Sequence, residues 1–289
     1  MKRVGVRLAR GIVVAAVLLT GGTLGDPAPS RTARALALVR AQDFTPLFDV
    51  AGRRVDAYFD PAKAEKLLDD LFSLSGKWKA VTRGRESYER YVRKAFEERV
   101  ASPAGFETVL GQIRADYDYG LRAAENRLLV ALYEDVRPAR PALTFEAFRA
   151  EYRDLAGTLA PDVVRDLGMN LISFAGSDAA AVLFVAALSS TGILGTSAAV
   201  GATGTPLTFG LSLAAGLVAG IALDAIVGSV YEDAARMAVR RQVNALRNRA
   251  IDDVHAGLVK ALLAYRTLQE RCVARLYEGD VHERVSDRP

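Results

Sequence analysis

Apolar side chains recur at steps of three and four residues along most of the chain, the spacing typical of amphipathic helices. In residues 30–165 this pattern predicts a helix from Asp60-Pro61 to Gly76, another over 85–100 and a third over 103–136. Shorter helices are expected to begin at polar capping residues or at a proline, namely at Ser30 or Thr32, at Thr144 and at Pro161. Because strand-like alternation is scarce, the pattern predicts an all-α helical bundle, with 30–165 as an amphipathic helical body.

The pattern changes in residues 179–223, which contain no charged side chain and are bounded by Asp178 and Asp224. Two apolar, helix-favouring runs flank a middle segment that is interrupted by residues disfavoured in helices, namely Gly192, Gly195, Gly201, Gly204 and Pro206. Gly201 stands midway between the two aspartates, so a turn there would bring both carboxylates to one level. We predict a central hydrophobic, Gly/Ala-rich helical hairpin over 167–231, with its tip near 195–206.

The arms of this hairpin, 179–194 and 207–223, would each be about 25 Å long at about 1.5 Å per residue. A hydrocarbon core is about 30 Å thick, so only arms extended past both aspartates would span it. The aspartates then either mark the membrane interface or lie in the apolar zone, where ionisable groups are usually functional. The pattern also permits a hairpin buried in the centre of a helical bundle, where helices are apolar on all sides.

Gly216 and Gly220 form a GxxxG step in the second arm. In lipid, small residues at this spacing let helix backbones approach closely. Two interpretations remain: the glycines form a seam for oligomerisation, or they contact only the alanine-rich first arm.

Residues 232–278 are predicted as one long amphipathic helix, which Gly279 ends before a disordered tail, 279–289. A basic cluster begins just after the second arm and comprises Arg236, Arg240, Arg241, Arg247 and Arg249. On one interpretation Arg236, Arg240 and Arg241 contact anionic lipid headgroups at a membrane surface. On the other, the cluster is a solvated helix face.

Residues 1–25 have the layout of a secretory signal peptide or an N-terminal anchor, since a basic segment precedes an apolar run. The formal net charge of +4 is matched by the basic residues of this segment, Lys2, Arg3, Arg7 and Arg10, so the remainder of the chain is neutral. A neutral body gives no argument for nucleic acid as a partner. The expected location is a bacterial cell envelope, on the periplasmic or extracellular face of the inner membrane, or outside the cell.

The order of these segments resembles that of known membrane-active proteins. An amphipathic helical body, the apolar hairpin over 179–223 and a final amphipathic helix are arranged as in colicin-type pore-forming domains. The layout is also similar to helical toxins of the haemolysin E and tripartite enterotoxin kind. The resemblance is one of architecture, because no sequence motif of these families is present, and it implies insertion of the hairpin into a bilayer.

Residues with catalytic chemistry are sparse. The two histidines, His255 and His282, have no third ligand at a zinc spacing, and the single cysteine, Cys272, occupies an apolar helix position typical of a buried thiol. Trp78 lies among basic residues, so it is interpreted either as a membrane-interface side chain or as a loop residue that caps the core. We expect no enzymatic activity, no metal and no cofactor.

The sequence thus favours an exported, membrane-associated protein that inserts a hydrophobic hairpin into a bilayer and forms pores or remodels membranes. Its expected partner is the lipid bilayer, with a second copy of the chain or an envelope protein as further candidates. The alternative is a non-catalytic envelope scaffold or interaction protein whose hairpin is only an anchor or a buried bundle core.

Overall fold

The computed structural model describes residues 30–168, 206–226 and 231–286, together with Leu183, Phe184, Ala186, Ala187 and Gly228. Side chains are described throughout except for 206–213 and 279–286. The described part of the chain is almost entirely helical and contains no strand, which confirms the all-α prediction. The signal-like segment 1–25 and the predicted hairpin tip before residue 206 lie outside the described residues.

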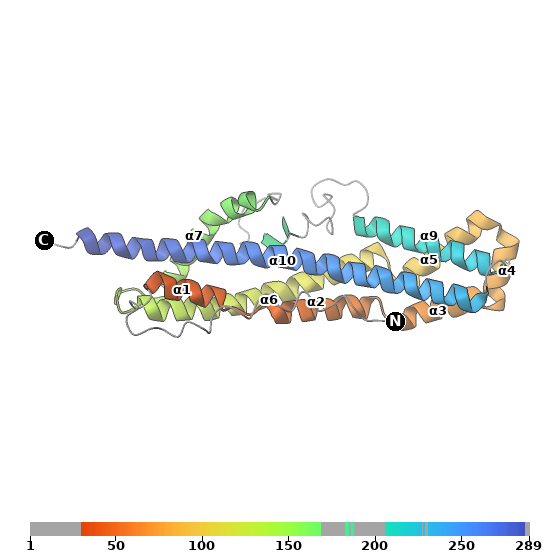
Figure 1. Ribbon diagram of the computed structural model, residues 1–289, viewed down its shortest axis with the longest axis horizontal. Coiled ribbons are helices and arrows are strands. Elements are labelled where there is room, and N and C mark those ends of the chain that lie inside the picture. The colour runs from red at the N-terminus through yellow and green to blue at the C-terminus, as the bar shows by residue number, and fades with distance from the viewer. Residues whose placement is uncertain are drawn as a thin grey trace, which may run out of the picture.

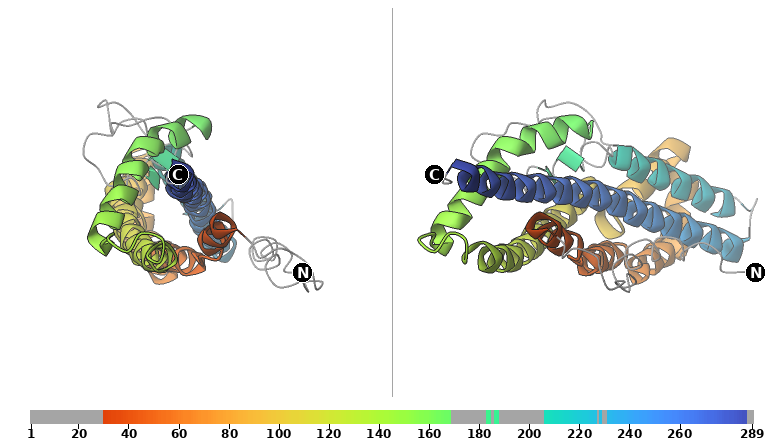
Figure 2. Two further views of the ribbon diagram at one scale, coloured as in Figure 1. Left: turned by 90° about the vertical axis from the view of Figure 1, so that its left-hand side faces the viewer. Right: turned by 60° about the vertical axis from the view of Figure 1, so that its left-hand side comes forward.

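The described helices form an elongated bundle (Figure 1). In chain order they are α1 (Arg31–Arg40), α2 (Thr45–Tyr58), α3 (Pro61–Phe72), α4 (Leu74–Arg83), α5 (Arg85–Arg99), α6 (Pro103–Val136), α7 (Phe145–Asp166), α9 (Pro206–Ile226) and α10 (Glu232–Ser286). Helix α4 forms one end of the bundle, close to the turn between α9 and α10. Helix α7 rises from the other end of α6 and packs beside α10 (Figure 2).

Helix α10 is the axis of the bundle and, at about 1.5 Å per residue, is roughly 80 Å long. Helices α1, α2 and α3 follow one another along it in the opposite direction (Figure 1). Polar contacts fix this antiparallel register in sequence order: Glu270 pairs with Arg40, His255 contacts the Phe48 carbonyl, and further contacts join Arg247 to Asp56, Arg240 to Glu65 and Arg236 to Asp69. The predicted long helix is therefore confirmed, and it lies against the N-terminal helices.

The core is a continuous apolar cluster to which every described helix contributes. Its largest fully buried side chains are aromatic and leucine residues, namely Tyr88, Tyr117, Tyr152, Phe59, Phe96, Phe148, Phe184, Leu67, Leu68, Leu71, Leu121 and Leu129. They come from helices far apart in the sequence, because the apolar stripe of an amphipathic helix is buried only where other helices pack over it. The Cys272 thiol is buried in this cluster, as predicted.

The predicted starts of four helices are confirmed by capping hydrogen bonds. The capping oxygens of Ser30, Asp60, Ser102 and Thr144 each accept a hydrogen bond from a backbone N–H of the first helical turn, at 2.9–3.2 Å. These side chains satisfy amide groups that have no partner inside the helix.

Three predicted helix boundaries are wrong. Gly76 lies inside α4 rather than at the end of α3, because Ser73 ends α3 and at once caps α4 through the Gly76 N–H. Pro161 lies inside α7, where one lost hydrogen bond is offset by buried neighbours on both sides, Ala160 and Val163. Helix α10 continues through Gly279 to Ser286, so these residues are helical rather than a disordered tail, since a single glycine costs a helix only about 1 kcal/mol.

Candidate functional site

The hairpin residues singled out from the sequence fall into two groups. Asp178, Gly192, Gly195, Gly201 and Gly204 lie outside the described residues. The others belong to the second arm: Pro206 begins α9, which also contains Gly216, Gly220 and Asp224. The second arm, predicted over 207–223, is therefore helical and extends from Pro206 to Ile226, whereas the pairing of two arms into a hairpin stays a prediction.

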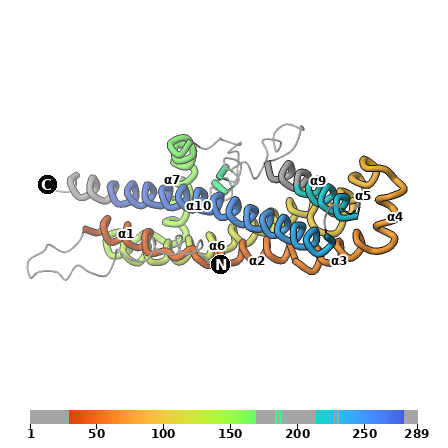
Figure 3. The backbone as a smooth tube through the Cα atoms, turned by 45° about the vertical axis from the view of Figure 1, so that its right-hand side comes forward, coloured from red at the N-terminus to blue at the C-terminus, as the bar shows by residue number. Residues whose placement is uncertain are grey.

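Helix α9 has one face towards the bundle and another away from it. The face towards the bundle is buried and consists mostly of alanine: Ala214, Ala215, Val218, Ala219, Ala222 and Leu223. It packs beside α5 and α10, with further contacts to α3, α4 and α6 (Figure 3). Small side chains on this face let the α9 backbone lie close to its neighbours.

The outer face of α9 carries the glycine step. A Cβ atom added at Gly216 would meet only the Arg93 Nη2 atom, at 4.0 Å, and one added at Gly220 would meet no atom of the described residues within 4 Å. Between them, Leu217 is 45% exposed. Among the described residues, therefore, the glycine step does not serve helix packing, and this face is apolar and open.

Four described residues of the predicted first arm are buried: Leu183, Phe184, Ala186 and Ala187. The Phe184 ring packs on the Tyr117 ring of α6 with 4.5 Å between centroids. Burial raises the pKa of the Tyr117 phenol well above its usual range, so this group stays neutral at any physiological pH. At these positions the apolar segment lies within the bundle.

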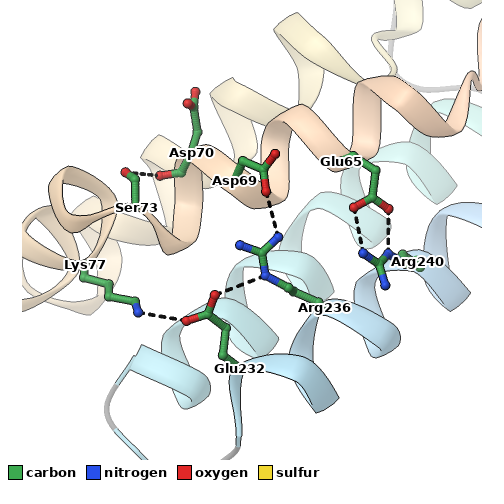
Figure 4. Close-up of polar contacts among 8 residues, drawn as sticks. All are labelled: Glu65, Asp69, Asp70, Ser73, Lys77, Glu232, Arg236 and Arg240. Atoms are coloured by element: carbon green, nitrogen blue, oxygen red, sulfur yellow. Dashed lines mark hydrogen bonds and ion pairs between the residues drawn. The ribbon is translucent and has the colours of Figure 1, made fainter.

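The first turns of α10 are attached to α3 and α4 by charged groups (Figure 4). Arg240 donates two hydrogen bonds to the Glu65 carboxylate, at 2.5 and 2.7 Å. Arg236 bridges Asp69 of α3, at 2.8 Å, and Glu232 of its own helix, at 3.1 Å. Glu232 also accepts a hydrogen bond from the Lys77 ammonium of α4, at 2.8 Å. The first turns of α10 are thus joined to α3 and α4 by ion pairs.

These ion pairs set the protonation of their carboxylates. Hydrogen bonding to the Arg240 guanidinium lowers the pKa of Glu65 below its ordinary value of 4.5. The Lys77 ammonium, and secondarily Arg236, lower the pKa of Glu232 in the same way. Both carboxylates are therefore ionised at neutral pH and hold α10 in place.

The predicted headgroup-binding arginines are accordingly placed in different surroundings. Arg236 and Arg240 have carboxylate partners within the protein, whereas Arg241 is exposed. Of the other two cluster members, Arg247 lies 3.5 Å from Asp56 of α2 and Arg249 lies 3.8 Å from Asp253 of α10. Asp69 and Glu65, the α3 partners of Arg236 and Arg240, are more than 160 residues away in sequence, so no local pattern could have identified them.

Of the two interpretations of Trp78, the structure contradicts the loop residue that caps the core and leaves the membrane-interface side chain as a prediction. Trp78 is 69% exposed on helix α4, and it neither lies in a loop nor caps the core. Leu74 and Val81, one turn before and after it, are also exposed. The signal that could have revealed this surface is the four-then-three spacing of these apolar residues behind the capping residue Ser73.

The remaining candidates for chemistry have structural roles. The His255 Nε2 atom lies 3.2 Å from the Phe48 carbonyl oxygen. Burial raises the pKa of the Cys272 thiol to about 12, which keeps it protonated and unreactive. Within the described ranges, no group of three or more His, Cys, Asp or Glu residues is placed to hold a metal ion.

Of the helices in the described part of the chain, none combines the length and the apolar character required to cross a membrane. No protein family, curated protein or solved structure matches the chain. A functional interpretation therefore depends on the residues and contacts given above.

Proposed function

We propose that the chain is an exported, membrane-associated helical protein that inserts its hydrophobic hairpin into a bilayer, as pore-forming or membrane-remodelling proteins do. The observation that supports this most directly is the uncharged character of 179–223 combined with the two faces of α9. One face is covered by the bundle, and on the other Leu217 is 45% exposed and no described atom lies within 4 Å of a Cβ added at Gly220.

The energetic argument compares α9 in the bundle with α9 in lipid. The bundle covers mainly alanine methyl groups, each worth roughly 0.8 kcal/mol when removed from water. A bilayer would cover the same methyl groups and also the outer face with Leu217. Because Asp224 is the single charged residue of α9 and lies near its end, insertion of the preceding residues carries no charge into the hydrocarbon.

Dye release from vesicles tests this proposal. We expect the full chain to release dye from vesicles that contain anionic lipid. Leu217→Arg places a charge on the outer face of α9, where an arginine at the bilayer centre costs about 2.5–3.5 kcal/mol, so release should slow about 100-fold. Val259→Arg is the matched control, because Val259 is 55% exposed on α10 and Leu217 is 45% exposed on α9. Absence of release by the unaltered chain, or equal loss in both variants, would contradict insertion.

A scaffold is the second candidate, and the burial of the inner face of α9 favours it. The apolar residues Ala215, Val218 and Ala219 already have partners in the bundle, so the segment serves as a core without any bilayer. Carbonate extraction of membranes from cells that produce the protein separates the two functions. Retention in the membrane supports insertion, whereas complete release into the wash supports the scaffold.

A further inference from the structure

Helix α4 packs against the bundle with its smallest residues and turns its largest apolar residues outwards. Gly76 and Ala80 are buried, whereas Leu74 is 87% exposed, Trp78 69% and Val81 72%. An ordinary amphipathic helix has the opposite arrangement, since its large apolar side chains face the core.

The orientation of α4 is fixed by Gly76. A Cβ atom at this position would lie 2.3 Å from the Leu71 carbonyl oxygen and 2.4 Å from that of Asp70, so only glycine lets α4 approach the end of α3 this closely. Ser73 caps the helix at the same place through a 3.1 Å hydrogen bond to the Gly76 N–H. On the opposite side, Leu74, Trp78 and Val81 follow one another at four- and three-residue steps and form one stripe.

The exposed stripe has an aromatic neighbour from another part of the chain. Tyr231 is 88% exposed and directly precedes Glu232, which accepts a hydrogen bond from Lys77 of α4 at 2.8 Å. Figure 3 shows that α4 and the start of α10 share one end of the elongated bundle. Exposed apolar and aromatic side chains from two parts of the chain thus lie at the same end of the bundle, where exposed apolar surface marks a candidate interaction site.

The charge around the stripe indicates the kind of partner. Residues 74–85 contain Lys77, Lys79, Arg83 and Arg85 and no acidic residue. Lys77 and Arg85 pair with Glu232 and Glu89. Lys79 and Arg83 lie over the Tyr91 ring, and within the described ranges no carboxylate pairs with either of them. A short helix with tryptophan and leucine on one face and unneutralised basic residues beside it matches an anionic lipid surface.

We propose that Leu74, Trp78, Val81 and Tyr231, together with the basic residues Lys79 and Arg83 of the same end of the bundle, dock the protein onto a bilayer that contains anionic lipid. The apolar stripe enters the headgroup region while the basic groups neutralise lipid phosphates. This inference rests on the proposed membrane function and adds a docking surface to it. Docking itself requires no insertion of the hairpin. It also places the α9–α10 turn at the membrane surface.

The single tryptophan of the chain makes this proposal directly measurable. Vesicles of phosphatidylcholine with phosphatidylglycerol should shift Trp78 emission to the blue, and brominated lipid should quench it. Vesicles of phosphatidylcholine alone should bind at least about tenfold more weakly, since each basic residue near an anionic surface contributes about fivefold. An unchanged Trp78 emission in saturating anionic vesicles would overturn the proposal.

Matched variants locate the contact. The double variant Leu74→Glu and Val81→Glu retains Trp78 and changes only exposed positions, so its circular dichroism should match that of the unaltered chain. Its vesicle binding should fall at least about tenfold, because two apolar contacts are replaced by charges that the anionic surface repels. Val259→Glu with Leu263→Glu, an exposed apolar pair on α10, is the control. Equal loss in both double variants would overturn docking through α4.

Dye release measured in the same samples separates docking from insertion. A Trp78 shift without release supports docking and contradicts insertion of the hairpin. Release without a Trp78 shift contradicts docking by this surface and leaves insertion supported.

Discussion

Helices α9 and α10 follow each other in the chain and pack side by side, yet different forces hold them. Helix α10 is joined by ion pairs to α1, α2, α3 and α7 along its length. Helix α9 contains one charged residue, Asp224, and its contact with the bundle is formed mainly by alanine. Charged side chains are costly to move from water into hydrocarbon, whereas an apolar helix face can be covered by protein or by lipid. Under the proposed function, α9 is therefore the helix that would exchange the bundle for a bilayer, and α10 the helix that would stay in it.

The largest expected effect concerns the packing of the buried face of α9 against the bundle. Ala219→Asp introduces a carboxylate at a fully buried position and should lower the free energy of unfolding by about 3 kcal/mol, because the charge has no described partner there. Leu217→Asp, on the exposed face of the same helix, should change it by less than about 0.5 kcal/mol. Denaturant unfolding measures both. Equal effects would show that α9 does not lie against the bundle as described.

A smaller effect is expected for the attachment of α10. The Arg240 and Glu65 side chains are 46% and 41% exposed, so solvent screening keeps the contribution of their paired hydrogen bonds to stability small. A double-mutant cycle with Arg240→Ala and Glu65→Ala measures this coupling directly. A coupling near zero would show that this ion pair does not help to attach α10 to the bundle, and would contradict the difference drawn between α9 and α10.

Substitution of Gly220 in the glycine step of α9 is expected to raise stability rather than lower it. Gly220→Leu meets no described atom within 4 Å, and replacing glycine inside a helix should raise stability by about 0.5 kcal/mol. If close helix packing in lipid uses this step, the same variant should release less dye from vesicles. Unchanged release by both Gly216→Leu and Gly220→Leu would count against a GxxxG seam.

Acid should weaken the ion pairs that attach α10 to the bundle before it affects the apolar packing of α9. The folded-state pKa values of Glu65 and Glu232 lie below their ordinary value of 4.5. Their contribution to stability is therefore complete above about pH 4.5 and declines as the pH falls through the lowered folded-state values. The double variant Glu65→Gln and Glu232→Gln should show a shallower loss of stability in this range. The change is modest, because both groups are near the surface, and an identical pH profile would contradict it.

Sequence alone was sufficient where local chemistry decides the structure. Capping residues such as Ser102 and Thr144, and apolar stripes such as that of α10, gave the fold class and most helix starts. The prediction failed at Gly76, because glycine commonly ends a helix but here lies inside α4 and permits close packing against the end of α3. Sequence alone could not supply the α3 partners of Arg236 and Arg240, because contacts between residues more than 160 positions apart depend on the whole bundle.

The central claim, that α9 leaves the bundle for a bilayer, is tested most directly by a probe on its outer face. Leu217→Cys can be labelled selectively with an environment-sensitive fluorophore, because Cys272 is buried and its raised pKa, about 12, keeps it unreactive. On addition of anionic vesicles, the account predicts that a quencher confined to the lipid acyl chains will quench this label. An unquenched label on vesicle-bound protein would contradict the account.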